Sequence, residues 1–195
     1  ALPGHAGDPG KQGAVDLDVL DRLPPAIRLE GDAEALKTGL IGDAEIVAEY
    51  QRAGGEAALE VVVPRSIAVK AAVVEEDFRE SGRRAILNFG HTIGHAVEIV
   101  AGVPHGYAVS IGMVAAAVIS NRRYGFDHGW LTDLLFSIGL PVAAAGISAR
   151  ACRDLVARDK KRSVDGIRMV LLRGIADPVV EPVTEDDIDL ALRSI

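Results

Sequence analysis

The chain has 195 residues, of which 49% are hydrophobic and 25% charged, so it is long enough for one sizeable globular core. Its net charge of −7 argues against nucleic acid or an anionic membrane as the main partner, because phosphate groups are bound by clustered Lys and Arg. The single cysteine, Cys152, excludes an intramolecular disulfide and a thiolate metal cluster, and a cytoplasmic location is the default expectation.

The chain is predicted to begin irregularly and then to become helical. Residues 1–15 are rich in Gly and Pro and lack apolar periodicity, so we expect a loop or a disordered remnant there. The rest, residues 16–195, is expected to form one helical domain. Over 16–50, short helical patterns alternate with turn signals at the Pro24-Pro25 pair and at Gly39.

Longer helices are predicted in the middle of the chain. Residues 55–76 fit one amphipathic helix, interrupted or restarted at Pro64, and residues 84–100 are helix-like despite Gly90 and Gly94. The fold class that follows is mainly α, with a small β-hairpin near the C-terminus. The remaining expected elements are an apolar helix over 108–125 ended by Gly125, helices over 129–138 and 148–160, hairpin strands over 167–174 and 179–183, and a last helix with a capping-box pattern at Thr184.

The most informative segment is RRAILNFGHTIGHAVE, residues 83–98. If it is a helix, the spacings of four, three and four place one polar stripe on one face: Arg84, Asn88, His91 and His95. The other faces are apolar, so the helix is expected to be buried, and buried polar groups need partners. Hydrogen-bonded core histidines would meet this need, and so would a cleft that holds a metal or an anion. The glycines beside the histidines indicate close approach by a ligand or by another backbone.

A catalytic metal needs three protein ligands and an open position, and imidazole with carboxylate is a usual set for zinc. His105, at the turn before the apolar helix, is a candidate to face His91. Spacing alone selects no carboxylate from the 28 acidic residues. The zinc-protease signature is absent, because Thr92 stands where a general-base Glu would follow the first His.

The segment NFGHTIGHAVE, followed by HGYAVSIGM, resembles the paired motif of the 3-dehydroquinate synthase family. Four other segments resemble family motifs in the same order: GDAEALK, RSIAVKAAVV, DFRESGRRAILN, and DKKR with IRMVLLRGIAD. The resemblance runs from about Asp16 to the end of the chain. It implies the helical C-terminal domain of the dehydroquinate synthase-like fold.

The resemblance also implies roles for individual residues. Glu34, His91 and His105 would bind the catalytic divalent metal, zinc or cobalt, and His95 would contact the substrate. Basic side chains around such a metal would neutralise an acidic sugar phosphate, although a solvated surface charge is the alternative for each lysine taken alone. The other positions that match substrate-site residues of the family are Lys37, Lys70, Arg84, Asn88 and Lys160, with Glu80 at an acidic position near the site.

The reaction that the resemblance implies is an NAD- and metal-dependent carbon–oxygen lyase step of the shikimate pathway, which leads to chorismate and the aromatic amino acids. It converts 3-deoxy-D-arabino-heptulosonate 7-phosphate to 3-dehydroquinate and phosphate. Related family members make aminodehydroquinate, 2-deoxy-scyllo-inosose or valiolone-type products. His95 weighs against the sedoheptulose phosphate cyclases, which lack this second His, but does not separate the others. A non-catalytic metal-binding remnant or interaction domain is a further interpretation.

The sequence departs from the family in three respects. No βαβ unit and no glycine-rich phosphate turn between a strand and a helix precede the motifs, so the Rossmann-like N-terminal half that binds NAD is expected to be absent. Tyr107 replaces the Glu of the family's HGE, and Phe78 interrupts an acidic run. The expected partners are a small sugar acid phosphate and either a second copy of the chain or a separate nucleotide-binding chain. No membrane span is expected, because no run approaches about 18 apolar residues.

Overall fold

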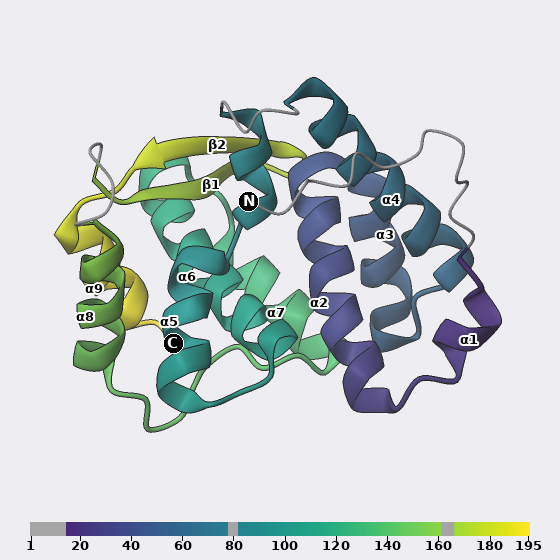
Figure 1. Ribbon diagram of the computed structural model, residues 1–195, viewed down its shortest axis with the longest axis horizontal. Coiled ribbons are helices and arrows are strands. Elements are labelled where there is room, and N and C mark those ends of the chain that lie inside the picture. The colour runs from purple at the N-terminus through teal and green to yellow at the C-terminus, as the bar shows by residue number, and fades with distance from the viewer. Residues whose placement is uncertain (1–14, 78–81, 161–165) are drawn as a thin grey trace, which may run out of the picture.

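The computed structural model describes residues 15–77, 82–160 and 166–195. The expected irregular start therefore lies almost entirely outside the described residues. Within them, most residues are helical and two strands form one antiparallel sheet (Figure 1). The elements in chain order are α1 (Leu17–Asp21), α2 (Pro25–Gly42), α3 (Ala44–Ala53), η1 (Gly54–Glu56), α4 (Leu59–Glu76), η2 (Arg83–Asn88), α5 (His91–Ala101), α6 (His105–Tyr124), α7 (His128–Ile138), α8 (Ala149–Lys160), β1 (Arg168–Gly174), β2 (Asp177–Pro182) and α9 (Glu185–Leu192).

Helix α6 is the centre of the core. It contacts α2, α5, α7, α9 and β1, and most of its residues are buried. A helix that is apolar on all sides is stable when other elements surround it, which is the case here. Helix α6 ends at Gly125 as predicted, but it begins at His105 rather than at residue 108. No described helix is both long enough and apolar enough to cross a membrane.

The prediction of one helix over residues 84–100 is wrong. Residues Arg83–Asn88 form the 3-10 helix η2, and α5 begins only at His91. Gly90 lies between them with φ of +78°, a conformation that glycine adopts far more readily than other residues. A Cβ atom on Gly112 of α6 would collide with the carbonyl oxygen of Gly90, so the two backbones are in direct contact. The sequence analysis expected either a ligand or another backbone to lie close to these glycines. The structure shows another backbone there.

Helices α2, α3 and α4 pack together at one end of the molecule, with α8 and α9 at the other (Figure 1). The turn expected at Gly39 is wrong, because α2 continues to Gly42. Gly39 instead lets α3 approach closely, since a Cβ atom there would lie 2.8 Å from Cβ of Ile46. Helix α4 begins at Leu59 rather than at residue 55 and runs through Pro64 without interruption.

The predicted hairpin and final helix are confirmed. Strands β1 and β2 pair antiparallel with Val170 opposite Val180, although β2 begins at Asp177 rather than at residue 179. The N–H of Leu172 donates to Oγ of Ser120 at 2.9 Å, which holds β1 against α6. Thr184 forms the expected capping box at the start of α9. The predicted helices over 129–138 and 148–160 correspond to α7 and α8.

Candidate metal centre

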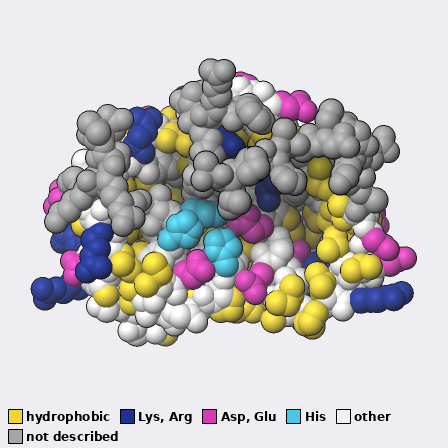
Figure 2. All heavy atoms as spheres, in the orientation of Figure 1, with side chains coloured by type: hydrophobic (Ala, Val, Ile, Leu, Met, Phe, Trp, Pro, Cys, Tyr) yellow, Lys and Arg dark blue, Asp and Glu magenta, His cyan; other side chains and the backbone are white. Residues whose placement is uncertain are grey.

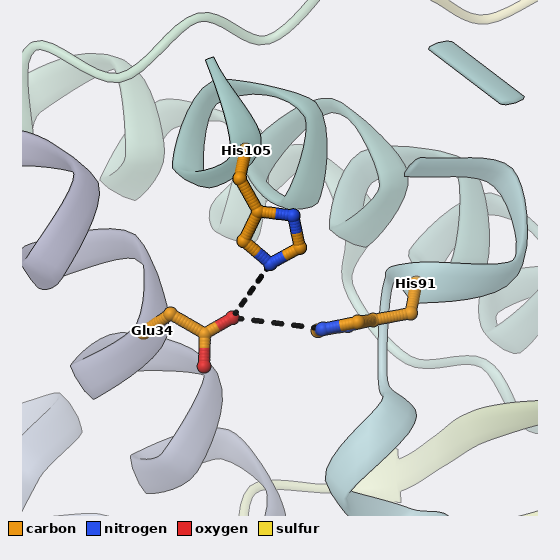
Figure 3. A group of neighbouring side chains, drawn as sticks. All are labelled: Glu34, His91 and His105. Carbon is orange, nitrogen blue, oxygen red and sulfur yellow. Dashed lines mark ion pairs between the residues drawn. The ribbon is translucent and has the colours of Figure 1, made fainter. Parts of the chain in front are cut away.

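Three side chains from three helices converge beside α6. Glu34 lies on α2, and His91 and His105 are the first residues of α5 and α6 (Figure 3). Oε1 of Glu34 is 3.7 Å from Nε2 of His91 and 3.8 Å from Nε2 of His105. Ligand atoms around four-coordinate zinc are separated by about 3.4 Å when the bonds are about 2.1 Å long. Both distances are close to this value, and the ligand atoms of the three residues all lie within 4.8 Å of one another, so they could hold a metal ion.

Both imidazole rings present the same nitrogen to Glu34. Nδ1 of His91 is 3.1 Å from the carbonyl oxygen of Phe89, and Nδ1 of His105 is 3.0 Å from Oε2 of Glu98. A carbonyl and a carboxylate accept hydrogen bonds, so each neutral ring carries its proton on Nδ1. Nε2 of each ring is then left with a lone pair that points toward Glu34.

The two oxygens of the Glu34 carboxylate have different surroundings. Oε2 accepts a hydrogen bond from Nζ of Lys37 at 2.8 Å, with Nζ of Lys70 at 3.7 Å. Oε1 is buried and has no hydrogen-bond donor in the described part of the chain. A buried polar atom without a partner costs free energy. A cation at the point where Oε1 meets the two Nε2 atoms would remove that cost, so the residues fit a divalent metal.

The charges around the site favour the protonation states that metal binding needs. Burial opposes ionisation of Glu34, but the ammonium of Lys37, with smaller effects of His91 and Lys70, holds the pKa of Glu34 below its ordinary value. Burial also lowers the pKa of Lys37, although Glu34 opposes that shift. Burial, with the nearby charge of Lys37, lowers the pKa of His91. An ionised carboxylate beside a neutral imidazole is the form that binds a metal ion.

Helix α2 carries Glu34 and also contacts the start of α6. Oε2 of Glu30, one helical turn before Glu34, accepts a hydrogen bond from the N–H of Gly106 at 3.2 Å. A Cβ atom on Gly106 would lie 2.5 Å from Cα of Glu30, so the two helices touch where His105 begins α6. The sequence analysis assigned no role to Glu30 or to Glu98, although Glu98 is the last residue of the NFGHTIGHAVE motif. For Glu30, the glycine directly after His105 is the sequence signal that could have indicated a close contact.

The predicted substrate-side residues are brought together in part. The His95 ring is 5.3 Å from the His91 ring, measured between centroids. A cavity of about 340 Å³ is lined by Asn88, His91 and His95 together with Arg168 of β1. Arg84 and Asn88 line another cavity of about 330 Å³. The predicted helical stripe is therefore wrong, but Asn88 of η2 still lines one cavity with His91 and His95 of α5.

Two predicted residues lie outside what can be described. Glu80 is not among the described residues, and Lys160 ends α8 without a described side chain.

Histidine and acidic side chains gather on one face of the molecule (Figure 2). Another cavity, of about 530 Å³, is lined by Arg28 and by parts of α1, η1 and α4, and none of the predicted site residues lines it.

Comparison with known protein families identifies the family of this chain. Residues 31–162 match the family model described as 3-dehydroquinate synthase C-terminal. This chain belongs to the 3-dehydroquinate synthase family. It is 42% identical over 173 residues to the 3-dehydroquinate synthase of Geobacter metallireducens, covering 83% of this chain and 48% of the relative. It is 39% identical to that of Methylacidiphilum infernorum, covering 93% and 52%. The chain thus spans about half the length of the relatives that it matches.

Solved structures of related enzymes share this fold. ValA, the 2-epi-5-epi-valiolone synthase from Streptomyces hygroscopicus with NAD⁺ and Zn²⁺ bound, superposes with a TM-score of 0.81 at 27% identity, covering 91% of this chain and 53% of that chain. A 2-deoxy-scyllo-inosose synthase complexed with carbaglucose-6-phosphate, NAD⁺ and Co²⁺ superposes with a TM-score of 0.75 at 26% identity, covering 91% and 55%. The predicted mainly helical domain of the dehydroquinate synthase-like fold is confirmed.

Proposed function

We propose that this chain is the metal- and substrate-binding part of a 3-dehydroquinate synthase, a lyase that acts on 3-deoxy-D-arabino-heptulosonate 7-phosphate. The observation that carries the proposal is the buried Oε1 of Glu34, which lacks a hydrogen-bond donor among the described residues and faces Nε2 of both His91 and His105. The choice of substrate is supported by identities of 39–42% to two 3-dehydroquinate synthases, against 26–27% to the two cyclases of known structure.

The proposed ion is a divalent metal, with zinc or cobalt favoured because the related enzymes carry these ions. Glu34, His91 and His105 would hold it. When bound, such an ion polarises the substrate hydroxyls that it contacts and makes them more acidic. Three protein ligands leave a position open for substrate, as in catalytic rather than structural zinc sites.

The remaining residues are proposed to bind and orient the substrate. His95 is exposed and lines the same cavity as Asn88, so both can reach a hydroxylated ligand beside the metal. Lys70 is about half exposed, and its Nζ lies 3.7 Å from Oε2 of Glu34, so it is close enough to the proposed metal site to contact an anionic group of the substrate. Lys37 is buried and paired with Glu34, so its main role is to keep that carboxylate ionised.

The reaction also requires a hydride carrier, which the protein must place against the substrate. The strands among the described residues form one antiparallel hairpin, whereas a dinucleotide-binding half is built from parallel βαβ units. We therefore propose that NAD is bound by protein outside the described residues, either in a longer form of this protein or in a separate chain.

Calorimetric titration of the metal-free chain with zinc tests the site. We expect one ion per chain, and no measurable binding by His91→Ala, because that variant loses a ligand. His128→Ala is the control, since His128 begins α7 and belongs to neither group of candidate ligands. Unchanged zinc affinity in His91→Ala would refute the assignment of the ligands.

A further inference from the structure

We propose that Glu98 is a positioning residue for His105, holding the imidazole so that Nε2 faces the metal. This inference rests on the proposed function, because it concerns a ligand of the proposed site. Glu98 lies on α5, three residues after His95, and His105 follows at the start of α6. Oε2 of Glu98 is 3.0 Å from Nδ1 of His105, on the side of the ring opposite to Glu34.

The two candidate histidine ligands are held in different ways. Nδ1 of His91 donates to a main-chain carbonyl, and its side chain is only 15% exposed, so its orientation is set by the backbone and by packing. The side chain of His105 is 44% exposed and lies at the first position of its helix. Side-chain packing thus restricts the ring of His105 less, and its Nδ1 contact is with a side chain. The orientation and tautomer of the His105 ring therefore depend on the side chain of Glu98, whereas those of the His91 ring depend on the backbone.

A carboxylate that accepts from Nδ1 affects the metal ligand in two ways. It keeps the proton on Nδ1, which leaves the lone pair on Nε2, and its negative charge makes Nε2 a better donor to a cation. Partners of this kind typically change metal affinity by about 10- to 100-fold. Glu98 therefore contributes to metal affinity without touching the ion.

Glu98 also belongs to a second group of potential ligands, together with His95 and His105. A second ion bound there would have to use Nδ1 of His105, since Nε2 of that ring faces Glu34. The hydrogen bond to Glu98 already occupies Nδ1. The geometry thus favours Glu98 as a partner of His105 over Glu98 as a ligand of its own ion.

The test compares Glu98→Ala and Glu98→Gln with the unmodified chain. Affinities for Zn²⁺ and Co²⁺ are measured by competition with a chromophoric chelator, together with the absorption spectrum of the Co²⁺ form. We expect Glu98→Ala to bind about 10- to 100-fold more weakly and to change the Co²⁺ spectrum. Glu98→Gln should lose less affinity, because its amide oxygen can still accept from Nδ1. The thermal midpoints of the metal-free proteins should agree, since a structural role alone would lower them.

Glu75→Ala is the matched control, because Glu75 is exposed on α4 and the same atoms are removed. It should bind metal as the unmodified chain does. Affinity of Glu98→Ala within twofold of the unmodified chain would overturn the inference while leaving the metal site intact. Two ions per unmodified chain, falling to one in Glu98→Ala, would overturn it by making Glu98 a ligand. An unmodified chain that binds no metal would overturn the proposed site and this inference together.

Discussion

The N–H of Gly106 donates to the carboxylate of Glu30, and this contact joins α6 to α2 one helical turn before the proposed ligand Glu34. Helix α6 has Pro104 at its N-cap position, which supplies no side-chain hydrogen bond. Glu30 therefore satisfies one of the N–H groups that the start of a helix leaves free. The same contact lies beside His105 and one turn from Glu34, so it helps to fix both the start of α6 and the arrangement of the proposed metal ligands.

We predict that Gly106→Ala weakens both folding and metal binding. Its Cβ would lie 2.5 Å from Cα of Glu30, so the start of α6 must move away from α2. Overpacking of this kind costs about 1–3 kcal/mol. Urea denaturation should show that loss, and zinc titration a lower affinity. Gly31→Ala is the control, because its Cβ meets no atom within 4 Å. That substitution should stabilise α2 by up to about 1 kcal/mol, and equal stability of the two variants would contradict the prediction.

We predict that Asp187→Asn lowers stability at neutral pH and that the loss disappears in acid. Burial opposes ionisation of Asp187, but hydrogen bonds from Thr184 and Arg123 hold its pKa below the ordinary value. A carboxyl with a depressed pKa stabilises the fold above its unfolded pKa of about 3.9, and this stabilisation is lost as pH falls through the lower folded pKa. The expected loss at pH 7 is about 1–3 kcal/mol.

Urea denaturation at a series of pH values from 7 to about 2.5 measures this effect. The range extends below the unfolded pKa of about 3.9 because the stabilisation is lost only there. Asp186→Asn is the control, because Asp186 is exposed on the same helix turn. It should cost only a few tenths of a kcal/mol, through the helix dipole. A difference between Asp187→Asn and the unmodified chain that stays constant down to the lowest pH would contradict the assigned cause.

We predict that Ala176→Gly stabilises the protein. Among the described residues, Ala176 is the non-glycine residue with a positive φ, +57°, in the turn between β1 and β2. The left-handed conformation costs an L-residue about 1–2 kcal/mol. Glycine avoids this cost but loses more conformational entropy on folding, so the expected net gain is about 0.5–1 kcal/mol. The thermal midpoint should rise by a few degrees. Ala145→Gly, in a turn without a positive φ at that residue, should lower it instead.

We predict that the chain alone releases no phosphate from 3-deoxy-D-arabino-heptulosonate 7-phosphate, even when zinc and NAD are supplied. The proposed chemistry needs a bound dinucleotide, and the described residues form no βαβ unit to hold one. A coupled phosphate assay measures the release. Adding the separately produced dinucleotide-binding half of a related synthase should restore activity if the two parts associate. Turnover by the chain alone would show that the dinucleotide is bound within it.

The identity of the substrate can be tested in the same restored system. The sugar acid phosphate of the shikimate pathway should release phosphate, whereas glucose 6-phosphate, the type of ligand mimicked in the inosose synthase complex, should not. The reverse preference would favour the 2-deoxy-scyllo-inosose synthase alternative. Release from neither substrate, in a restored system that binds zinc and NAD, would favour the alternative of a metal-binding domain without turnover.

The amino-acid sequence by itself determined much of this protein. Hydrophobic periodicity and turn residues predicted the later helices, the hairpin and the capping box at Thr184, because these depend on interactions between near neighbours in the chain. The NFGHTIGHAVE motif identified His91 and His95 as candidates for chemistry. Periodicity failed at Gly90, because a left-handed glycine divides a segment whose apolar pattern continues across it.

Only the tertiary structure decided how the side chains of the candidate site are arranged. It brought Glu34 to His91 and His105 across three helices, turned one carboxylate oxygen to the lysines and left the other facing the imidazoles. It also placed Glu30 against Gly106 and Glu98 against His105, contacts that no local spacing predicts, although Glu98 is the last residue of the NFGHTIGHAVE motif. These contacts join residues from separate helices and arise from the way α2, α5 and α6 pack against one another. Helical spacing predicts which residues share a face, but the packing of the helices determines which residues that face contacts.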